Sequence, residues 1–225
     1  DQTAVIGPAG ERLVRFANVI VEGRALGRGG IGAVLGSKKI KGIAVRGSGS
    51  LTVHDMEATL EKTRELLTVM RGNPATGQVL PRYGTPVLVT ANNSLGLFGS
   101  RNWQQETFDA ADSLSAENMR DTIVIRNKAC FACPIGCSKY STVSSGPYKG
   151  YTMEGPEYEN IFALGSMCDN DSIEIVAAAE RTCDDWGIDA IETGVAIAFT
   201  MELRQRKLLS REHTDEVDVV FGNRE

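Results

Sequence analysis

Three cysteines stand close together near the middle of the 225-residue chain. They belong to the segment Cys130-Phe-Ala-Cys133-Pro-Ile-Gly-Cys137, whose spacing is C-x2-C-x3-C. A loop of this length can direct three thiolates at one small inorganic core, and iron–sulfur cubanes use such soft ligands, usually four of them. Gly136 permits a sharp backbone turn, and Pro134 stiffens the loop. The spacing therefore favours an iron–sulfur site.

Two other interpretations of the cysteine loop stay open. A structural zinc ion would need a fourth ligand, and neither His54 nor His213 is near the loop in sequence, although folding could bring one of them in. The three thiols could also be ordinary buried side chains. The remaining cysteines, Cys168 and Cys183, fall at expected helical positions, where we expect core packing.

The composition excludes several classes of protein. Three of the five cysteines lie within eight residues, which suits a metal site better than a secreted disulfide scaffold. The net charge of −5 arises from 29 acidic and 24 basic residues mixed along the chain, with no basic footprint for nucleic acid. We find no secretory signal and no apolar run near the roughly 18 residues that span a bilayer. We therefore expect a cytoplasmic protein that binds a small molecule or another protein, and neither nucleic acid nor a membrane.

A glycine-rich segment, Gly27-Arg-Gly-Gly-Ile-Gly32, satisfies the pattern G-x-G-x-x-G of dinucleotide-binding folds. Only about seven residues separate it from the next expected strand at Ile40, too few for the crossover helix of a βαβ unit, and the expected acidic residue about twenty positions on is not in place. The glycines would instead let the backbone approach a flat or phosphorylated ligand, with Arg24 or Arg28 available for a phosphate. A simple glycine-rich turn is the other interpretation.

The elements that must position these residues change character near residue 50. Short strands are expected at 4–6, in the run 13–21 and at 40–46, before a flexible break at 47–50. The periodicity then predicts helices at 56–71, 86–95, 156–166, 171–186 and 189–205, with strand-like runs at 122–125 and 217–221. We predict an α+β fold with two segments, a short β segment at 1–50 and a mainly helical region with the cysteine loop at 51–225.

Seven segments, in order, resemble the tungsten-containing aldehyde:ferredoxin oxidoreductase family. They are Gly7-Pro-Ala-Gly-Glu11, Val14-Arg-Phe-Ala17, Arg24-Ala-Leu-Gly-Arg-Gly-Gly30, Gly32-Ala-Val-Leu-Gly-Ser-Lys38, the cysteine loop 130–137, Gly155-Pro-Glu-Tyr-Glu159 and Asp184-Asp-Trp-Gly-Ile-Asp189. The resemblance covers residues 7 to 189. It implies that the chain is a central fragment of a longer enzyme and that residues 1–50 end a pterin-binding β base.

The resemblance implies two cofactors. One is a tungsten or molybdenum atom held by the dithiolene sulfurs of two pterins, so no side chain need ligate the tungsten. The other is a [4Fe-4S] cluster, which Cys130, Cys133 and Cys137 would hold. The family's fourth cysteine lies in a later D-x-x-G-L-C motif, and this chain ends before it.

Two further motifs carry the pterin contacts of the family. The stretch R-A-x-G-R lies against the pterin, and its counterparts here are Arg24, Ala25, Gly27 and Arg28. The motif D-x-x-G-L-D contacts a pterin, and its counterparts are Asp184, Ile188 and Asp189, with isoleucine in place of leucine. The same turn also has a structural interpretation, because Gly187 can end one helix while Asp189 and Glu192 cap the next.

One acid has a catalytic counterpart in the family. Glu159 matches the glutamate placed near tungsten, where it could activate water or the aldehyde. Taken alone, Glu157 and Glu159 would simply favour the first turn of a helix opened by Pro156. Members with a dimer-bridging iron carry an E-x-x-H motif, which the stretch Ala178-Ala-Glu-Arg181 lacks, so neither that iron nor that dimer is expected.

By this resemblance the intact enzyme would oxidise an aldehyde to a carboxylate and pass electrons through the [4Fe-4S] cluster to ferredoxin. The implied partners are ferredoxin, a small aldehyde and the remaining segments of the longer chain. Two rival functions stay open, a related tungsten enzyme that reduces acyl or aromatic thioesters and a non-catalytic iron–sulfur or zinc module. We expect the isolated fragment to be inactive, because part of the pocket wall is missing from it.

Overall fold

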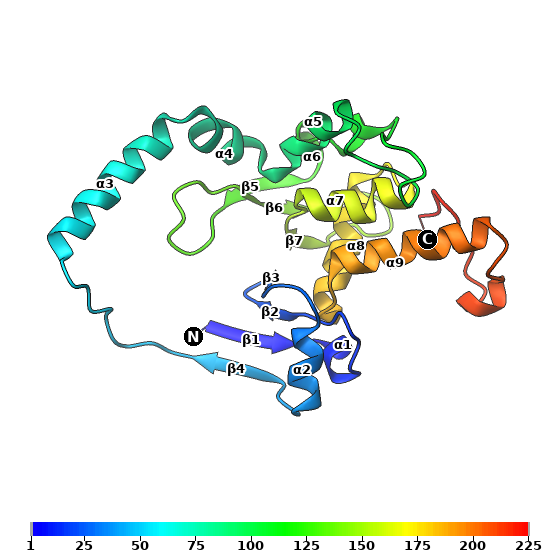
Figure 1. Cartoon of the computed structure of the whole chain (residues 1–225), viewed down its shortest axis with the longest axis horizontal. Coiled ribbons are helices and arrows are strands. Elements are labelled where there is room, and N and C mark those ends of the chain that lie inside the picture. The colour runs from blue at the N-terminus through cyan, green and yellow to red at the C-terminus, as the bar shows by residue number, and fades with distance from the viewer. Residues whose placement is uncertain (1, 225) are drawn as a thin grey trace.

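The computed structural model describes residues 2–224, so residues 1 and 225, the outer ends of the two expected segments, lie outside the described residues. Two antiparallel sheets organise the chain, one with the strand order β3-β2-β1-β4 and the other with the order β5-β6-β7. In Figure 1 the first sheet lies in the blue N-terminal part, and a cyan arm leads from it to the larger helical part. The α+β class predicted from the sequence is confirmed.

The N-terminal unit consists of short elements. They are β1 (Gln2–Ile6), α1 (Pro8–Glu11), β2 (Val19–Val21), β3 (Arg24–Ala25), α2 (Ile31–Ser37) and β4 (Gly42–Val45). Because β4 pairs with β1 in antiparallel orientation, the glycine-rich segment is not part of a parallel βαβ unit. The expected strand in the run 13–21 forms only at its end, since Leu13 adopts a positive φ of 59° and Ala17 N–H closes a turn onto the carbonyl of Val14.

The helix α2 begins at Ile31, inside the glycine-rich segment, and fills most of the short stretch where only a connection was expected. Glycine makes the helix possible there, because a Cβ at Gly36 would lie 2.0 Å from the carbonyl oxygen of Gly10. Similarly, a Cβ at Gly32 would lie 2.4 Å from the carbonyl oxygen of Asn18. By contrast, Gly27 and Gly29 have open space around them. Part of the motif therefore serves close backbone packing, and part remains free to face a ligand.

The arm is the helix α3 (Met56–Gly72), which confirms the helix expected at 56–71. Asp55 caps it as expected, since its Oδ1 accepts a hydrogen bond from the amide of Ala58 at 2.9 Å. None of its residues is buried, and Leu60 and Val69 on its apolar positions are exposed. These side chains are exposed because α3 lies away from both sheets (Figure 1).

The larger part carries the remaining elements. The helices are α4 (Leu80–Tyr83), α5 (Leu88–Ser94), α6 (Ala116–Thr122), α7 (Tyr158–Leu164), α8 (Ile173–Trp186) and α9 (Ala190–Gln205). The strands are β5 (Val124–Lys128), β6 (Ser138–Thr142) and β7 (Thr152–Glu154). The helices expected at 86–95, 171–186 and 189–205 are thus confirmed within a few residues. That expected at 156–166 is shorter, since Gly165 ends it.

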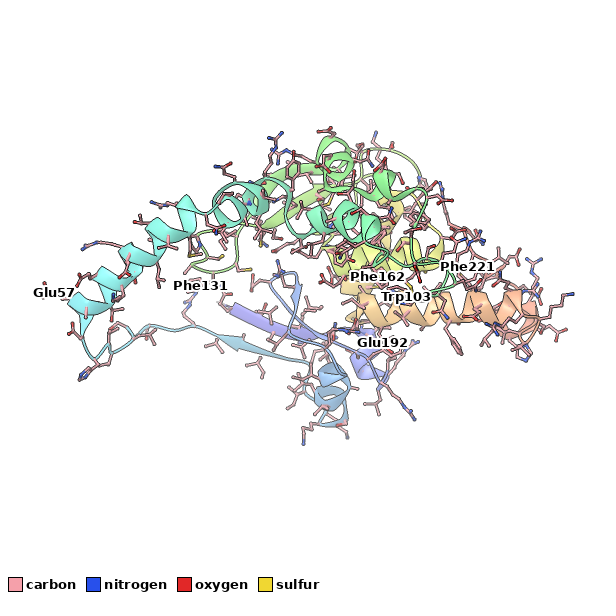
Figure 2. All side chains as sticks on the ribbon, turned by 45° about the horizontal axis from the view of Figure 1, so that its top comes forward. Glu57, Trp103, Phe131, Phe162, Glu192 and Phe221 are labelled. Carbon is pink, nitrogen blue, oxygen red and sulfur yellow. The ribbon has the colours of Figure 1, made fainter. Side chains whose placement is uncertain are left out.

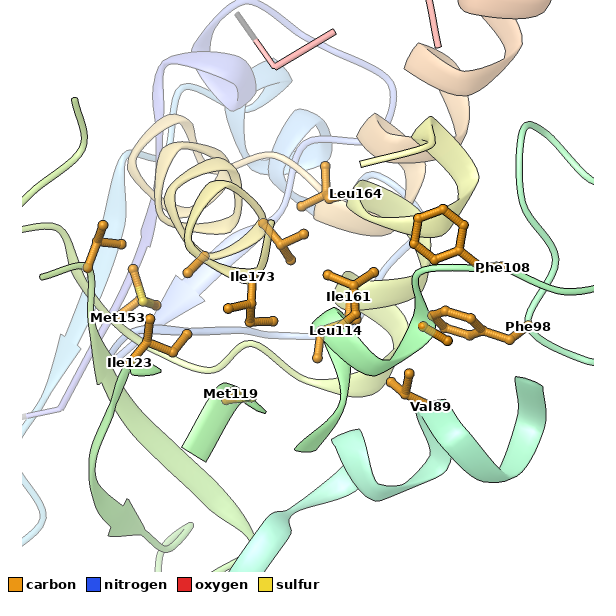
Figure 3. Close-up of a cluster of buried hydrophobic side chains, with 14 residues drawn as sticks. Val89, Phe98, Phe108, Leu114, Met119, Ile123, Met153, Ile161, Leu164 and Ile173 are labelled. Atoms are coloured by element: carbon orange, nitrogen blue, oxygen red, sulfur yellow. The ribbon is translucent and has the colours of Figure 1, made fainter. Parts of the chain in front are cut away.

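One buried cluster holds these elements together. It contains Phe98, Leu114, Met119, Ile161 and Ile173, which come from α6, α7, α8 and the segment between α5 and α6 (Figure 3). Burial of each such side chain stabilises the fold by about 1.5–3 kcal/mol. The cluster therefore fixes α7 and α8, whose outer ends form the site described below.

The C-terminal end differs from the expectation. The run 217–221 is not a strand but a turn, because its amides bond within the segment and Gly222 N–H bonds to the carbonyl of Cys168. Val219 and Phe221 pack against Met167 and Met201 in a small second core. Cys168 and Cys183 are buried, as expected for core residues. Across residues 2–224, no helix combines the length and apolar character that a bilayer crossing requires.

Candidate functional site

A cavity of about 260 Å³ lies where the N-terminal unit meets α7, α8 and α9. Seven of the eight predicted catalytic and cofactor-binding residues line it, namely Arg24, Ala25, Arg28, Glu159, Asp184, Ile188 and Asp189. Gly27 lies between the two arginines with a φ of 68° and is exposed outside the lining. The fold thus gathers residues that the sequence spreads from 24 to 189.

The turn between α8 and α9 anchors this cavity to the N-terminal unit. Gly187 adopts the left-handed conformation (φ 64°) and its carbonyl accepts the amide of Asn18 at 2.7 Å. The amide of Asp189 bonds to the carbonyl of Phe16 at 3.0 Å. The Oδ1 of Asp189 also accepts the amide of Glu192 at 3.0 Å, which confirms the caps expected from Gly187 and Asp189. The side chain of Glu192 does not complete the capping box, because its Oε2 lies 3.4 Å from Nη2 of Arg28.

Ion pairs hold both predicted arginines in place. Arg24 donates from Nη1 to Glu154 at 2.6 Å and lies 3.6 Å from Glu157, while Arg28 donates from Nε to Asp189 at 2.6 Å. Burial alone would lower the pKa of Arg24, but the hydrogen bond and charge of Glu154 raise it above its ordinary value. Both guanidinium groups are therefore fixed cations on the cavity wall, each partly exposed toward a ligand.

Two acids from one face of α8 lie deeper in the wall. Burial raises the pKa of Asp184 to about 7, against the opposing charge of Arg181. Glu180, one helical turn earlier, is 5% exposed, and burial together with the charge of Asp184 raises its pKa well above the ordinary value. The cavity wall therefore contains two carboxyl groups that keep a proton to higher pH than an ordinary carboxyl group does.

Two buried polar atoms on this wall lack a hydrogen-bond partner among the described residues. They are Oδ1 of Asn18 and Oε2 of Glu180, and both residues line the cavity. A buried polar atom is costly to leave unpaired, so such atoms point to a polar ligand or to ordered water. The wall fits a heterocycle with hydrogen-bonding edges, such as a pterin.

The cysteine loop connects β5 to β6. The amide of Cys133 bonds to the carbonyl of Cys130 at 3.0 Å, and Gly136 turns the chain with a φ of 63°, the conformation expected for it. The loop projects from the sheet with Phe131 fully exposed at its tip (Figure 2). Burial raises the pKa of the Cys137 thiol, and the charges of Glu157, Cys130 and Cys133 add to the rise. The three thiols are thus close enough to influence one another.

A site for a single metal ion is the other arrangement that the loop could form. Within residues 2–224 no three His, Cys, Asp or Glu side chains lie together as a site for one metal ion. Three soft thiolates on one exposed turn still fit a cubane, since each thiolate there binds a separate iron atom.

The cysteine loop and the cavity are neighbours. Glu157 lines the cavity and acts on the pKa of Cys137, while Arg24 lines the cavity and responds to the charge of Cys130. Lys139 fixes the end of the loop, because its buried ammonium donates hydrogen bonds to the carbonyls of Cys137 at 2.9 Å and Pro81 at 3.0 Å.

Sequence reasoning missed several of these residues. Glu180 stands four positions before Asp184, and this spacing puts both on one helix face, which could have identified it. Asn18 directly follows a matched segment, so its position was a usable signal too. The burial of Lys139 had no sequence signal, because lysine is rarely buried and nothing local predicts it.

Two family models match most of the chain. The model of the aldehyde ferredoxin oxidoreductase N-terminal domain matches residues 1–47, and that of domains 2 and 3 of the same enzyme matches residues 61–225. A tungsten-containing aldehyde ferredoxin oxidoreductase of Thermococcus kodakarensis is 44% identical over 92% of this chain and 34% of its own length. A protein of the same name from Pyrococcus abyssi is 43% identical over 100% of this chain and 37% of its own length.

More distant relatives share the fold. The WOR-like subunit of an aliphatic sulfonate oxidoreductase from Pyrococcus furiosus is 33% identical over 92% of this chain and 33% of its length. The active-site complex BamBC of benzoyl coenzyme A reductase, solved with 1,5-dienoyl-CoA, matches with a TM-score of 0.70 and 22% identity over 94% of this chain and 33% of that one. The chain thus spans about a third of the length of the relatives it matches.

Proposed function

This chain belongs to the aldehyde ferredoxin oxidoreductase family, and on that premise we propose that it is the central part of a tungsten enzyme that oxidises aldehydes to carboxylates and sends the electrons through a [4Fe-4S] cluster to ferredoxin. One observation carries the proposal. The matched segments around Arg24, Glu159 and Asp184 line a single cavity beside the cysteine loop. The remaining segments of the longer chain would complete its walls.

The loop would supply three of the cluster's four thiolates, from Cys130, Cys133 and Cys137. When bound, the tungsten bis-pterin supplies a two-electron redox centre, and the cluster supplies a one-electron carrier. The charges of Glu157 and Arg24 act on both the loop and the cavity, so the two sites are adjacent without an intervening domain. Short separation of this kind is what electron transfer between them requires.

The pterin-binding role falls to two edges of the cavity. Ala25 and the open backbone at Gly27 leave room for a flat ring, and Arg28 offers donors beside them. On the opposite edge, Asp184 and Ile188 offer a carboxyl and an apolar side chain, and Asp189 holds Arg28 in place. The cavity therefore offers both hydrogen-bond donors and hydrogen-bond acceptors, as a pterin requires because its ring carries groups of both kinds.

Glu159 would act as the general base. It lines the cavity, is exposed to solvent and stands in the first turn of α7, so a water molecule or an aldehyde hydrate can reach it. Conversion of an aldehyde to a carboxylate takes up the oxygen of water and releases an electron pair together with protons. Glu159 would accept one of these protons at its carboxylate.

The test is an assay of the full-length protein, purified without oxygen, on aldehydes and on acyl and aromatic thioesters. We expect aldehyde-dependent reduction of a viologen dye, and we expect Glu159→Gln to lower the rate by about 100-fold or more while the metal content is kept. Reaction with thioesters alone would support the reductase alternative, and inactivity with both classes of substrate would support the non-catalytic module.

A further inference from the structure

Glu180 is the buried acid of the cavity that the proposed reaction does not use. Its Oε1 accepts a hydrogen bond from Asn160 Nδ2 at 2.6 Å, and its Oε2 has no partner among the described residues. The carboxyl group packs against the backbone of Gly155, where a Cβ would lie only 2.6 Å from Oε1. The side chain is therefore held firmly, with one oxygen atom unused on the cavity wall.

The charges around Glu180 favour its neutral form. Burial is the largest cause that raises the pKa of Glu180, and the charges of Asp184 and Glu157 add to it, while the hydrogen bond from Asn160 and the charge of Arg24 act in the opposite direction. That guanidinium is already paired with Glu154 and Glu157. A carboxyl group buried among acids without its own cation holds its proton, and the proton makes it a hydrogen-bond donor.

The two polar atoms of the cavity wall that lack a partner have opposite hydrogen-bonding roles. Asn18 presents an unpartnered acceptor, Oδ1, and a neutral Glu180 presents a donor at Oε2. A pterin ring carries N–H groups as well as a carbonyl and ring nitrogens, so it can satisfy both. Neither atom has a partner within residues 2–224, which suggests that a ligand supplies it.

We propose that Glu180 is a further cofactor-binding residue of this cavity, a neutral carboxyl group whose Oε2–H donates a hydrogen bond to an acceptor atom of the bound pterin. The proposal rests on the function proposed above, since it requires a pterin in the cavity. It assigns Glu180 to binding and leaves the chemistry to Glu159.

The test uses the full-length protein, purified without oxygen, with three variants. Glu180→Gln keeps an acceptor for Asn160 and puts an N–H donor at the second position, whereas Glu180→Leu removes both. Asp185→Asn is the control, because Asp185 is an exposed acid on the same helix. We measure pterin and tungsten per polypeptide, circular dichroism, and the infrared band of protonated carboxyl groups at pH 7.

We expect Glu180→Leu to weaken pterin binding by about tenfold, which is the effect of one lost buried hydrogen bond, and so to lower the pterin retained per polypeptide. Glu180→Gln and Asp185→Asn should keep it within about twofold of the wild type on the same reasoning. Glu180→Gln should remove a protonated carboxyl band that Asp185→Asn leaves in place. Loss of this band would show that Glu180 is neutral, and a lower pterin content in a folded Glu180→Leu variant would assign the neutral carboxyl group to pterin binding.

Two results would overturn the role of Glu180 alone. One is a wild type loaded with pterin and a folded Glu180→Leu variant loaded equally. The other is an infrared spectrum in which Glu180→Gln and the wild type have the same protonated carboxyl bands, a comparison that decides the matter even if Glu180→Leu does not fold. A wild type without pterin would instead refute the proposed function, and the role of Glu180 with it.

Discussion

Arg28 donates from Nε to Oδ2 of Asp189 at 2.6 Å, across 161 positions of the sequence. The other oxygen of the same carboxylate caps α9 by accepting the amide of Glu192. Asp189 is 2% exposed, so this one side chain both starts a helix and holds the glycine-rich segment against it. The position of Arg28 on the cavity wall therefore depends on Asp189.

Replacement of Asp189 should destabilise the protein more than replacement of an ordinary cap. Asp189→Ala removes the helix cap and the charge-assisted bond to Arg28, and we expect a loss of about 2–4 kcal/mol. Asp55→Ala, at the exposed start of α3, removes only a cap and should cost about 1 kcal/mol or less. Thermal unfolding of the full-length variants gives the comparison. If Asp189→Ala and Asp55→Ala lower the melting temperature equally, Asp189 does not hold the glycine-rich segment against α9.

The cysteine loop should account for the bound iron. Cys137→Ser should lower iron content by more than half, because a hydroxyl is a poor substitute for a soft thiolate. Cys183→Ala is the matched control, since Cys183 is buried in α8 away from the loop. Iron analysis and the visible absorption of the anaerobic protein provide the measurement. Iron loss in the Cys183 variant, or its full retention in the Cys137 variant, would contradict the assignment.

The stability of the protein should depend on pH through Asp184. Its pKa of about 7 in the folded state lies above the ordinary value of 3.8, so the folded state binds more protons than the unfolded state between these limits. Stability from this group is therefore present at low pH and lost as pH rises toward 7. Asp184→Asn, in protein prepared without tungsten, should flatten the fall of melting temperature between about pH 4 and pH 7.

Glu61→Gln serves as the control for that measurement, because Glu61 is an exposed acid on α3 and is not among the groups that shift the pKa of Asp184. It should leave the pH dependence of the melting temperature as it is in the wild type. If Asp184→Asn has the same pH dependence of the melting temperature as the wild type, Asp184 does not hold a proton in the folded state.

Lys139 should prove necessary for the geometry of the loop. Lys139→Met keeps the volume of the side chain but leaves the carbonyls of Cys137 and Pro81 without a donor, which should cost about 1–3 kcal/mol. Lys149→Met, at an exposed lysine, should change the melting temperature little. Lower iron content together with lower stability in the Lys139 variant would support this role. An unchanged melting temperature would contradict it.

Much of the fold followed from local patterns. The helices α3, α8 and α9 were predictable because their apolar period and their caps, Asp55 and Asp189 among them, agree with each other. The prediction of a strand-like run at 217–221 was wrong, because valine-rich segments form a strand only where a partner strand is present. The helix α2 was missed because its glycines serve packing against Gly10 and Asn18, which no local signal reveals.

Most residues of the candidate site were predictable from motifs, but two buried residues were not. Motif resemblance located the cysteines, Glu159 and the pterin-contacting residues, and the structure places most of them around one cavity. The buried acid Glu180 and the buried cation Lys139 depend on tertiary burial, which composition and period do not encode. The roles of all these residues, and the division of the chain near residue 50, stay predictions.

The central claim is that this chain holds an iron–sulfur cluster beside a metal-bearing pterin. Elemental analysis of the full-length protein, purified without oxygen, tests it most directly. We predict tungsten or molybdenum together with about four iron atoms per chain and no stoichiometric zinc. Zinc in place of iron, or a protein that contains neither iron nor tungsten nor molybdenum, would contradict the claim.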